Sequence, residues 1–385
     1  MNQSSYLAAI AILATIALTV HLIEKCAPSK DSPAHLASID GLRGYLAAFV
    51  FLHHASIWYF YLHTGIWRVP PSNLFTHFGE SSVVLFFMVS GFLYFSKLFA
   101  AKLRPIDWRK LYISRLFRLA PLYFFALLLL VLIVAIKTDG QLKQAPLDLL
   151  AAIARWAGFS LFGTPDINGL EGTALIIAGV SWSIAYEWVF YSLLPLSACA
   201  FGIRPPTRWL LLGWCGIIIA IGMHAAPKIL GMFLGGLVAA ALVRSKRFCQ
   251  LARHQVSSVL CIACLVVLVI LFRSAYHFAA VALLTIPFAL IAGGNNLFGL
   301  LSNATAIAMG RISYSVYMLH GIILFVAFDM VAAPQASPSL LVHWANTLLL
   351  TPVVVVLSFL SFRYIERPAM EFASACARRR ENKSP

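Results

Sequence analysis

Apolar runs of about 20 residues recur along this whole chain, and each is long enough to cross a hydrocarbon core of about 30 Å. Of the 385 residues, 61% are hydrophobic and only 11% are charged, whereas about 25% of the residues in soluble proteins are charged. A soluble surface needs more polar cover than this composition supplies, but a lipid-facing surface does not. The sequence therefore predicts an all-α, polytopic integral membrane protein.

Eleven apolar segments divide the chain, and the first covers residues 6–23. No Lys or Arg precedes this segment, and Glu24, Lys25 and Cys26 follow it where a signal-peptide cleavage site needs small residues. We therefore expect an uncleaved helix within an N-terminal region, 1–37, followed by a ten-helix membrane domain, 38–368, and a basic cytoplasmic tail, 369–385. The ten spans are expected at residues 43–62, 78–97, 116–136, 173–200, 209–224, 227–243, 255–272, 277–292, 307–328 and 341–362.

The positive charges predict the orientation of these spans. If all eleven segments cross the membrane, 23 of the 29 Lys and Arg residues fall on one side. An excess of positive charge marks the cytoplasmic side, so the C-terminus is expected in the cytoplasm. We also expect the protein in a bacterial inner membrane, with membrane lipids as partners. Because the charges lie between apolar runs, the net charge of +15 does not indicate nucleic acid. Cys261 and Cys264 have the spacing of half a metal site, but without a second pair they predict packing, and no metal site is expected.

Arg43 and His54 are the first candidates for chemistry, because ionisable side chains inside a membrane span are costly and usually functional. His54 lies eleven residues after Arg43, which is roughly 16 Å deeper along a helix. Eleven steps of about 100° return to within about 20° of the start, so the two share a face, whereas His53 points elsewhere. This arrangement suggests a path leading inward from Arg43. The alternative is a histidine satisfied by a neighbouring helix.

Arg115 and Arg118 lie in the densest cationic stretch and, three residues apart, share a helical face. Two guanidinium groups on one face suit a phosphate or pyrophosphate. The alternative is a charge that only sets topology and attracts anionic lipid.

Glu187 lies between long apolar stretches, where a carboxylate must pair, bind a cation or become protonated. We expect it to orient His54 and to stabilise its protonated form. Five further residues are expected to line one cavity with His54: Ser90, Trp182, Ser313, Tyr317 and His320. The alternative is that they only pack against neighbouring helices or form local hydrogen bonds with the backbone.

An ordered set of short motifs over residues 38–368 resembles the acyltransferase 3 family of membrane proteins. The motifs are Asp40-Gly41-Leu42-Arg43-Gly44, His54, Ser90-Gly91-Phe92, Arg115 with Arg118, Trp182-Ser183, Glu187, Phe190-Tyr191, Gly310-Arg311-Ile312-Ser313-Tyr314-Ser315, Tyr317, His320 and Glu366-Arg367-Pro368. The resemblance implies transfer of an acyl group, often acetyl, from a cytoplasmic thioester to a sugar hydroxyl. It also implies that Arg43 and His54 are required and that Arg115 and Arg118 serve the donor.

These features predict an O-acyltransferase. Its expected donor substrate is acyl-coenzyme A, with acetyl-coenzyme A as the first candidate. No tightly bound cofactor is expected. In this hypothesis His54 is the general base, Glu187 orients it, and Arg115, Arg118 and Arg43 contact the donor phosphates. The acceptor is a glycan or a lipid-linked sugar. One alternative is a transporter or flippase of a lipid-linked sugar without acyl transfer, which polar groups inside spans also fit. Another is a structural or sensory subunit.

Overall fold

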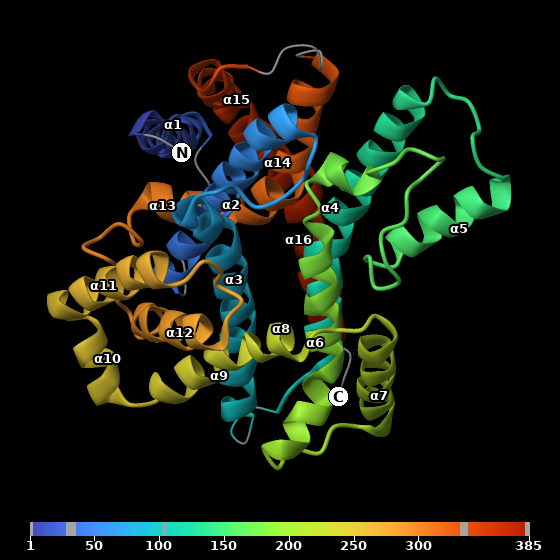
Figure 1. Cartoon of the computed structure of the whole chain (residues 1–385). Coiled ribbons are helices and arrows are strands. Elements are labelled where there is room, and N and C mark those ends of the chain that lie inside the picture. The colour runs from blue at the N-terminus through green and yellow to red at the C-terminus, as the bar shows by residue number, and fades with distance from the viewer. Residues whose placement is uncertain (1–2, 28–35, 102, 104, 332–337, 382–385) are drawn as a thin grey trace. The chain divides into compact units, whose positions relative to one another are not determined.

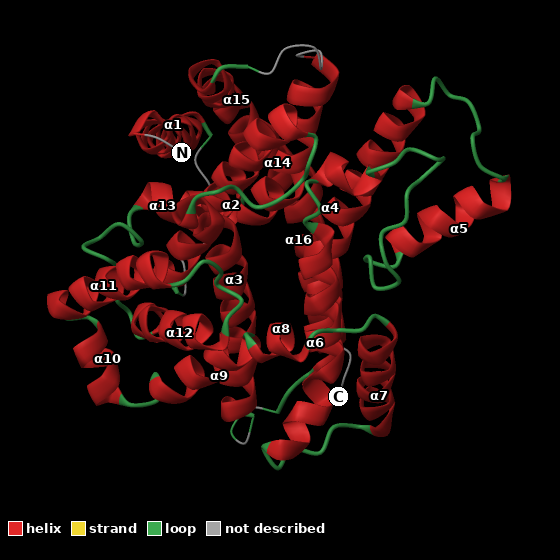
Figure 2. Cartoon of the chain, in the orientation of Figure 1, coloured by secondary structure: helices red, strands yellow, loops and turns green. Residues whose placement is uncertain are grey.

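The computed structural model describes residues 3–27, 36–101, 103, 105–331 and 338–381. Helices and their connections make up this part of the chain, and no β-strand occurs in it (Figures 1 and 2). The main helices are α1 (Gln3–Cys26), α2 (Ala37–Thr64), α3 (Asn73–Ala100), α4 (Trp108–Lys137), α5 (Pro146–Ala157), α6 (Ser181–Ala200), α7 (Thr207–Gly222), α8 (Pro227–Gly231), α9 (Phe233–Leu242), α10 (Lys246–Ala252), α11 (Gln255–Leu271), α12 (Phe278–Ala292), α13 (Ala304–Arg311), α14 (Ser313–Phe325), α15 (Leu340–Ser361) and α16 (Arg367–Glu381). The all-α prediction is confirmed.

The length and apolarity of these helices confirm a multi-pass membrane protein. Within the described residues, six helices are long and apolar enough to cross a membrane, or up to seven if the bent pair Pro227–Leu242 and Lys246–Ala252 forms one span. Three further apolar helices, α7, α11 and α12, are shorter. The total of eleven spans stays a prediction.

The helix expected at 173–200 begins later than predicted. Thr173–Ile177 forms a 3₁₀ turn, η1, and Ala178 and Gly179 follow it with φ angles of 51° and 68°. Positive φ angles cannot continue a right-handed helix, so α6 starts only at Ser181. The segment expected at 307–328 is also divided, into α13, α14 and the π-helix η2 (Val326–Val331). The tail expected at 369–385 is helical to Glu381, and residues 382–385 lie outside the described part.

The first of two compact units contains Met1–Phe99, Ala226–Tyr317 and Ala327–Val356. Within it, α2 and α13 cross closely because glycines face the partner helix. A Cβ on Gly310 would meet the backbone of Asp40, and one on Gly44 would meet Met309. Small residues of this kind let membrane helices approach to backbone contact, which fixes the first turns of α2, where Arg43 lies, against the end of α13.

Helix α1 is part of this first unit and is held at both of its ends. Its buried stripe is formed by Ser5, Ala9, Ile12, Ile16 and Val20, at helical spacing. The indole nitrogen of Trp344 donates a hydrogen bond of 3.2 Å to Ser5 Oγ. At the other end, Glu24 pairs with Arg311 at 2.8 Å. That α1 is an uncleaved helix stays a prediction.

The second unit contains Ala100–Ala225, Met318–Val326 and Leu357–Pro385. In it α6 packs along α7, and α4 packs against α16 and the π-helix η3 (Phe362–Glu366) (Figure 1). The connection after α4 is ordered by Asn168, whose side chain accepts from the backbone of Lys143 and donates to Thr138 and Gln141. This connection carries the amphipathic helix α5, which buries Trp156.

Contacts within the first unit agree with the predicted alternation of sides. Glu24 and Arg311 both belong to expected cytoplasmic ends, and they form an ion pair. His77 and Phe272 belong to expected outer ends, and Nε2 of His77 lies 2.7 Å from the carbonyl oxygen of Phe272. An error of one span, or of any odd number, between these segments would place such partners on opposite sides of the membrane. That the first side faces the cytoplasm stays a prediction.

Candidate functional site

Arg43 and His54 lie on one uninterrupted helix, α2. The shared face expected from their spacing therefore exists, since no break changes the helical phase between them. Both side chains are partly exposed, but Ala47 and Val50 lie between them on that face and are buried. The exposed surface is thus not continuous from Arg43 to His54.

The imidazole of His54 is oriented by its own helix. Its Nδ1 lies 3.1 Å from the backbone oxygen of Val50, and the ring stacks against Trp67 with centroids 6.4 Å apart. A carbonyl oxygen can only accept, so Nδ1 carries the proton and Nε2 is the basic nitrogen of the neutral ring. The backbone of α2 thus holds the ring in this tautomer, and the part that sequence analysis gave to Glu187, orienting His54, stays a prediction.

The adjacent His53 has a different environment. It is buried, its Nδ1 lies 2.7 Å from the carbonyl oxygen of Phe75, and its ring packs against Gly79 with no room for a Cβ there. His53 therefore joins α2 to α3 by packing, and only His54 of the two has the partial exposure that a catalytic base requires.

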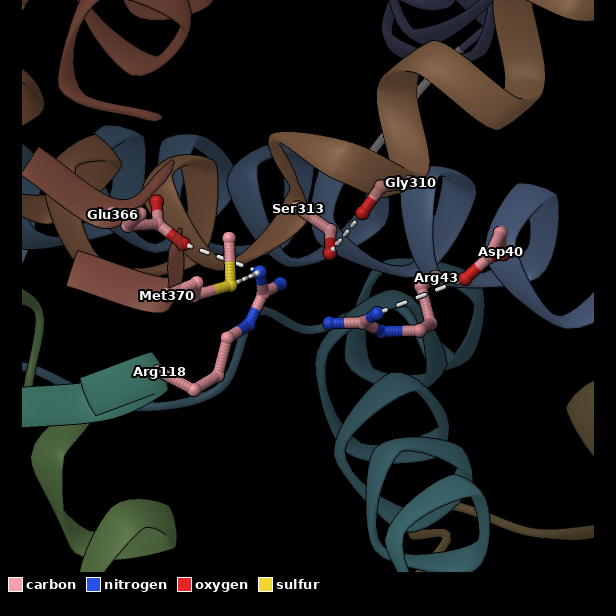
Figure 3. Close-up of polar contacts among 7 residues, drawn as sticks. All are labelled: Asp40, Arg43, Arg118, Gly310, Ser313, Glu366 and Met370. Carbon is pink, nitrogen blue, oxygen red and sulfur yellow. Dashed lines mark hydrogen bonds and ion pairs between the residues drawn. The ribbon is translucent and has the colours of Figure 1, made fainter. Parts of the chain in front are cut away.

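Arg118 on α4 meets a carboxylate from the C-terminal part of the second unit. Its Nη1 lies 3.8 Å from Oε2 of Glu366 and donates to Sδ of Met370 at 3.1 Å (Figure 3). The side chain of Arg118 is 17% exposed, whereas that of Glu366 is fully buried. Arg115, one turn earlier on α4, is also partly exposed. Both arginines keep some access to a ligand.

Arg43 has a weaker partner in the first unit. Its Nη1 lies 3.9 Å from Oδ1 of Asp40, one turn earlier on α2, and the side chains are 25% and 34% exposed (Figure 3). A same-helix pair of this kind contributes little in solvent.

Glu187 accepts a hydrogen bond of 2.9 Å from the hydroxyl of Tyr191 on its own helix, α6. Trp182, on the same helix, packs its ring against Tyr186 with centroids 5.8 Å apart. Because Glu187 belongs to the second unit and His54 to the first, their pairing stays a prediction.

The remaining predicted cavity residues are partly or fully buried. Ser313, Tyr317 and His320 lie on the continuous helix α14 and share a face as expected. The Ser313 hydroxyl donates to the carbonyl oxygen of Gly310 at 2.8 Å, across the break at Ile312 (Figure 3). Ser90 is partly exposed, and the backbone of Phe233 packs against the neighbouring Gly91. That these residues line one cavity with His54 stays a prediction.

Sequence analysis missed a buried carboxylate, Glu80, inside the segment expected at 78–97. Glu80 on α3 accepts hydrogen bonds from the hydroxyl of Ser274 and the backbone of Ala275. Burial raises the pKa of the neighbouring Tyr276, and the nearby Glu80 and Tyr317 raise that pKa further. The rule that singled out Glu187 also applied to Glu80, so the signal was present in the sequence.

Comparison with known proteins gives one match. The model of the acyltransferase 3 family, described as an acyltransferase domain, matches residues 36–363. This range begins after α1 and ends within η3. No curated protein and no solved structure shows a significant match.

Proposed function

Because the chain belongs to the acyltransferase 3 family, we propose that it moves an acyl group from cytoplasmic acyl-coenzyme A to a hydroxyl group of a cell-envelope or exported glycan. Acetyl is the acyl group we propose first. The protein would act in a bacterial inner membrane with α16 on the cytoplasmic side. The structural observation that supports this function is the hydrogen bond from His54 to Val50, because it leaves Nε2 basic inside a membrane helix.

In the proposed reaction, Nε2 of His54 accepts the proton of the acceptor hydroxyl while the hydroxyl oxygen attacks the thioester carbonyl carbon. The carbon–sulfur bond then breaks, and the departing coenzyme A thiolate takes a proton from the imidazolium. A carboxylate beside the ring would stabilise its charged form, which is the part we assign to Glu187. Arg115, Arg118 and Arg43 would bind the donor phosphates.

A stepwise variant passes the acyl group first to His54 or to a hydroxyl such as that of Ser313 or Tyr317. Incubation of the purified protein with labelled acetyl-coenzyme A and no acceptor distinguishes the two routes. Label retained on the denatured chain supports the stepwise route, and its absence together with normal turnover supports direct transfer.

The proposed function is tested with inside-out membrane vesicles that contain or lack the chain. Acetyl-coenzyme A labelled in the acetyl group is added, and label in the membrane glycans is measured. Label that depends on the chain supports acyl transfer. Chain-dependent movement of an unmodified lipid-linked sugar, without label in glycans, would instead support the flippase.

A further inference from the structure

Glu366 is a buried carboxylate at the last position of the π-helix η3, and its side chain is fully buried. A charge removed from water in this way is tolerated only when it is paired. The wider turn of a π-helix changes the direction of the side chains after it, and such turns are frequent at functional sites. The position of Glu366 therefore calls for a specific partner.

That partner is Arg118, which sequence analysis assigned to the donor phosphates. The separation of 3.8 Å between Nη1 and Oε2 is that of an ion pair rather than a hydrogen bond. Both this contact and the bond to Met370 fall on Nη1, whereas a guanidinium has five N–H donors. Both contacts therefore fall on one corner of the planar group.

Further contacts join the first turns of α4, near Arg118, to the neighbouring helices. Phe117, next to Arg118, packs against Phe372 of α16 with ring centroids 5.4 Å apart. Tyr112 stacks on Trp209 and donates to the backbone of Tyr191. The first turns of α4, which carry Arg115 and Arg118, are therefore held from two directions.

We infer that Glu366 is the positioning residue of the proposed donor site. It holds the guanidinium of Arg118 in one orientation and offsets its charge, so that the remaining N–H groups and Arg115 receive the coenzyme A phosphates. The inference rests on the proposed function for the identity of the ligand. A pair that only joined α16 to α4 would stabilise the fold without affecting donor affinity.

The experiment measures the equilibrium binding of coenzyme A to the purified full-length protein, so that no acceptor is needed. Glu366→Gln keeps the side-chain shape and removes the charge. We expect a dissociation constant about tenfold higher, which is the effect of one misplaced charged contact, and partial recovery in Glu366→Asp. Glu371→Gln is the matched control, because Glu371 lies on α16 and pairs with Arg367 in an exposed position. Its affinity should equal that of wild type.

The exchanged pair Arg118→Glu with Glu366→Arg tests whether an ion pair between α4 and η3 is by itself enough for donor binding. It restores an ion pair but places no cation at position 118, so weak binding in folded protein is expected. Wild-type affinity in Glu366→Gln, or recovered affinity in the exchanged pair, would overturn the inference while leaving the proposed function intact. If wild type itself failed to bind coenzyme A, the inference and the proposed donor would both be wrong.

Discussion

Arg43 in the first unit and Arg118 in the second are both predicted donor contacts, yet their guanidinium groups are held differently. Arg43 lies near Asp40 of its own helix, and the carboxylate is 34% exposed. Arg118 lies near Glu366 of another element, and that carboxylate is fully buried. Solvent therefore screens the first pair more strongly than the second, in which only the Arg118 side chain is partly exposed.

The difference indicates that the two arginines contribute to donor binding in different ways. A screened pair costs little to break, so Asp40 should do little to hold Arg43 away from an incoming anion. A desolvated pair is costly to break, so Arg118 should keep one orientation with and without ligand. The following predictions test this contrast.

The largest expected effect is on stability. Glu366→Ala should lower the free energy of unfolding by about 3–5 kcal/mol, because it leaves the largely desolvated Arg118 charge without its carboxylate. Asp40→Ala should lower it by about 0–1 kcal/mol. Denaturant titration of the detergent-solubilised variants measures both values. Equal losses of unfolding free energy in the two variants would contradict the proposed difference between the two ion pairs.

Next in size is the response of donor affinity to Arg→Lys replacement. Lysine lacks the rigid planar fork of arginine, so Arg118→Lys should weaken coenzyme A binding by about tenfold. Arg43→Lys retains a mobile charge, and a loss of less than about threefold is expected. Isothermal titration of the two variants gives the comparison, and a larger loss for Arg43→Lys would reverse our assignment.

The smallest expected effect concerns the pair between α1 and α13. Glu24 and Arg311 come from different elements, as Arg118 and Glu366 do, but their side chains are 27% and 24% exposed. Glu24→Gln should therefore cost about 0–1 kcal/mol, and less at high salt. Unfolding curves at two salt concentrations test this. A loss independent of salt would mean that exposure does not explain the contrast.

Helix positions were predictable because apolarity along the sequence sets them directly. The shared face of Arg43 and His54 also followed from spacing, since α2 is unbroken. The start of α6 was missed because the left-handed residues Ala178 and Gly179 leave no mark in hydropathy.

Partners from distant segments were not predictable. The Glu366-Arg367-Pro368 motif was recognised as part of the family resemblance, but the spacing of residues along one helix does not show that Glu366 meets Arg118. The tautomer of His54 depends on a backbone oxygen, which residue identity does not reveal.

The most direct test of the central claim is the rate of acetyl transfer from acetyl-coenzyme A to membrane glycans in His54→Ala and His63→Ala at matched expression. His63 is the control because it lies on α2 with the same Nδ1 contact to its own helix, Tyr59, but is exposed. General base catalysis supplies roughly 10²–10⁴-fold, so His54→Ala should lose at least about a hundredfold and His63→Ala should match wild type. A wild-type rate in His54→Ala would contradict the account.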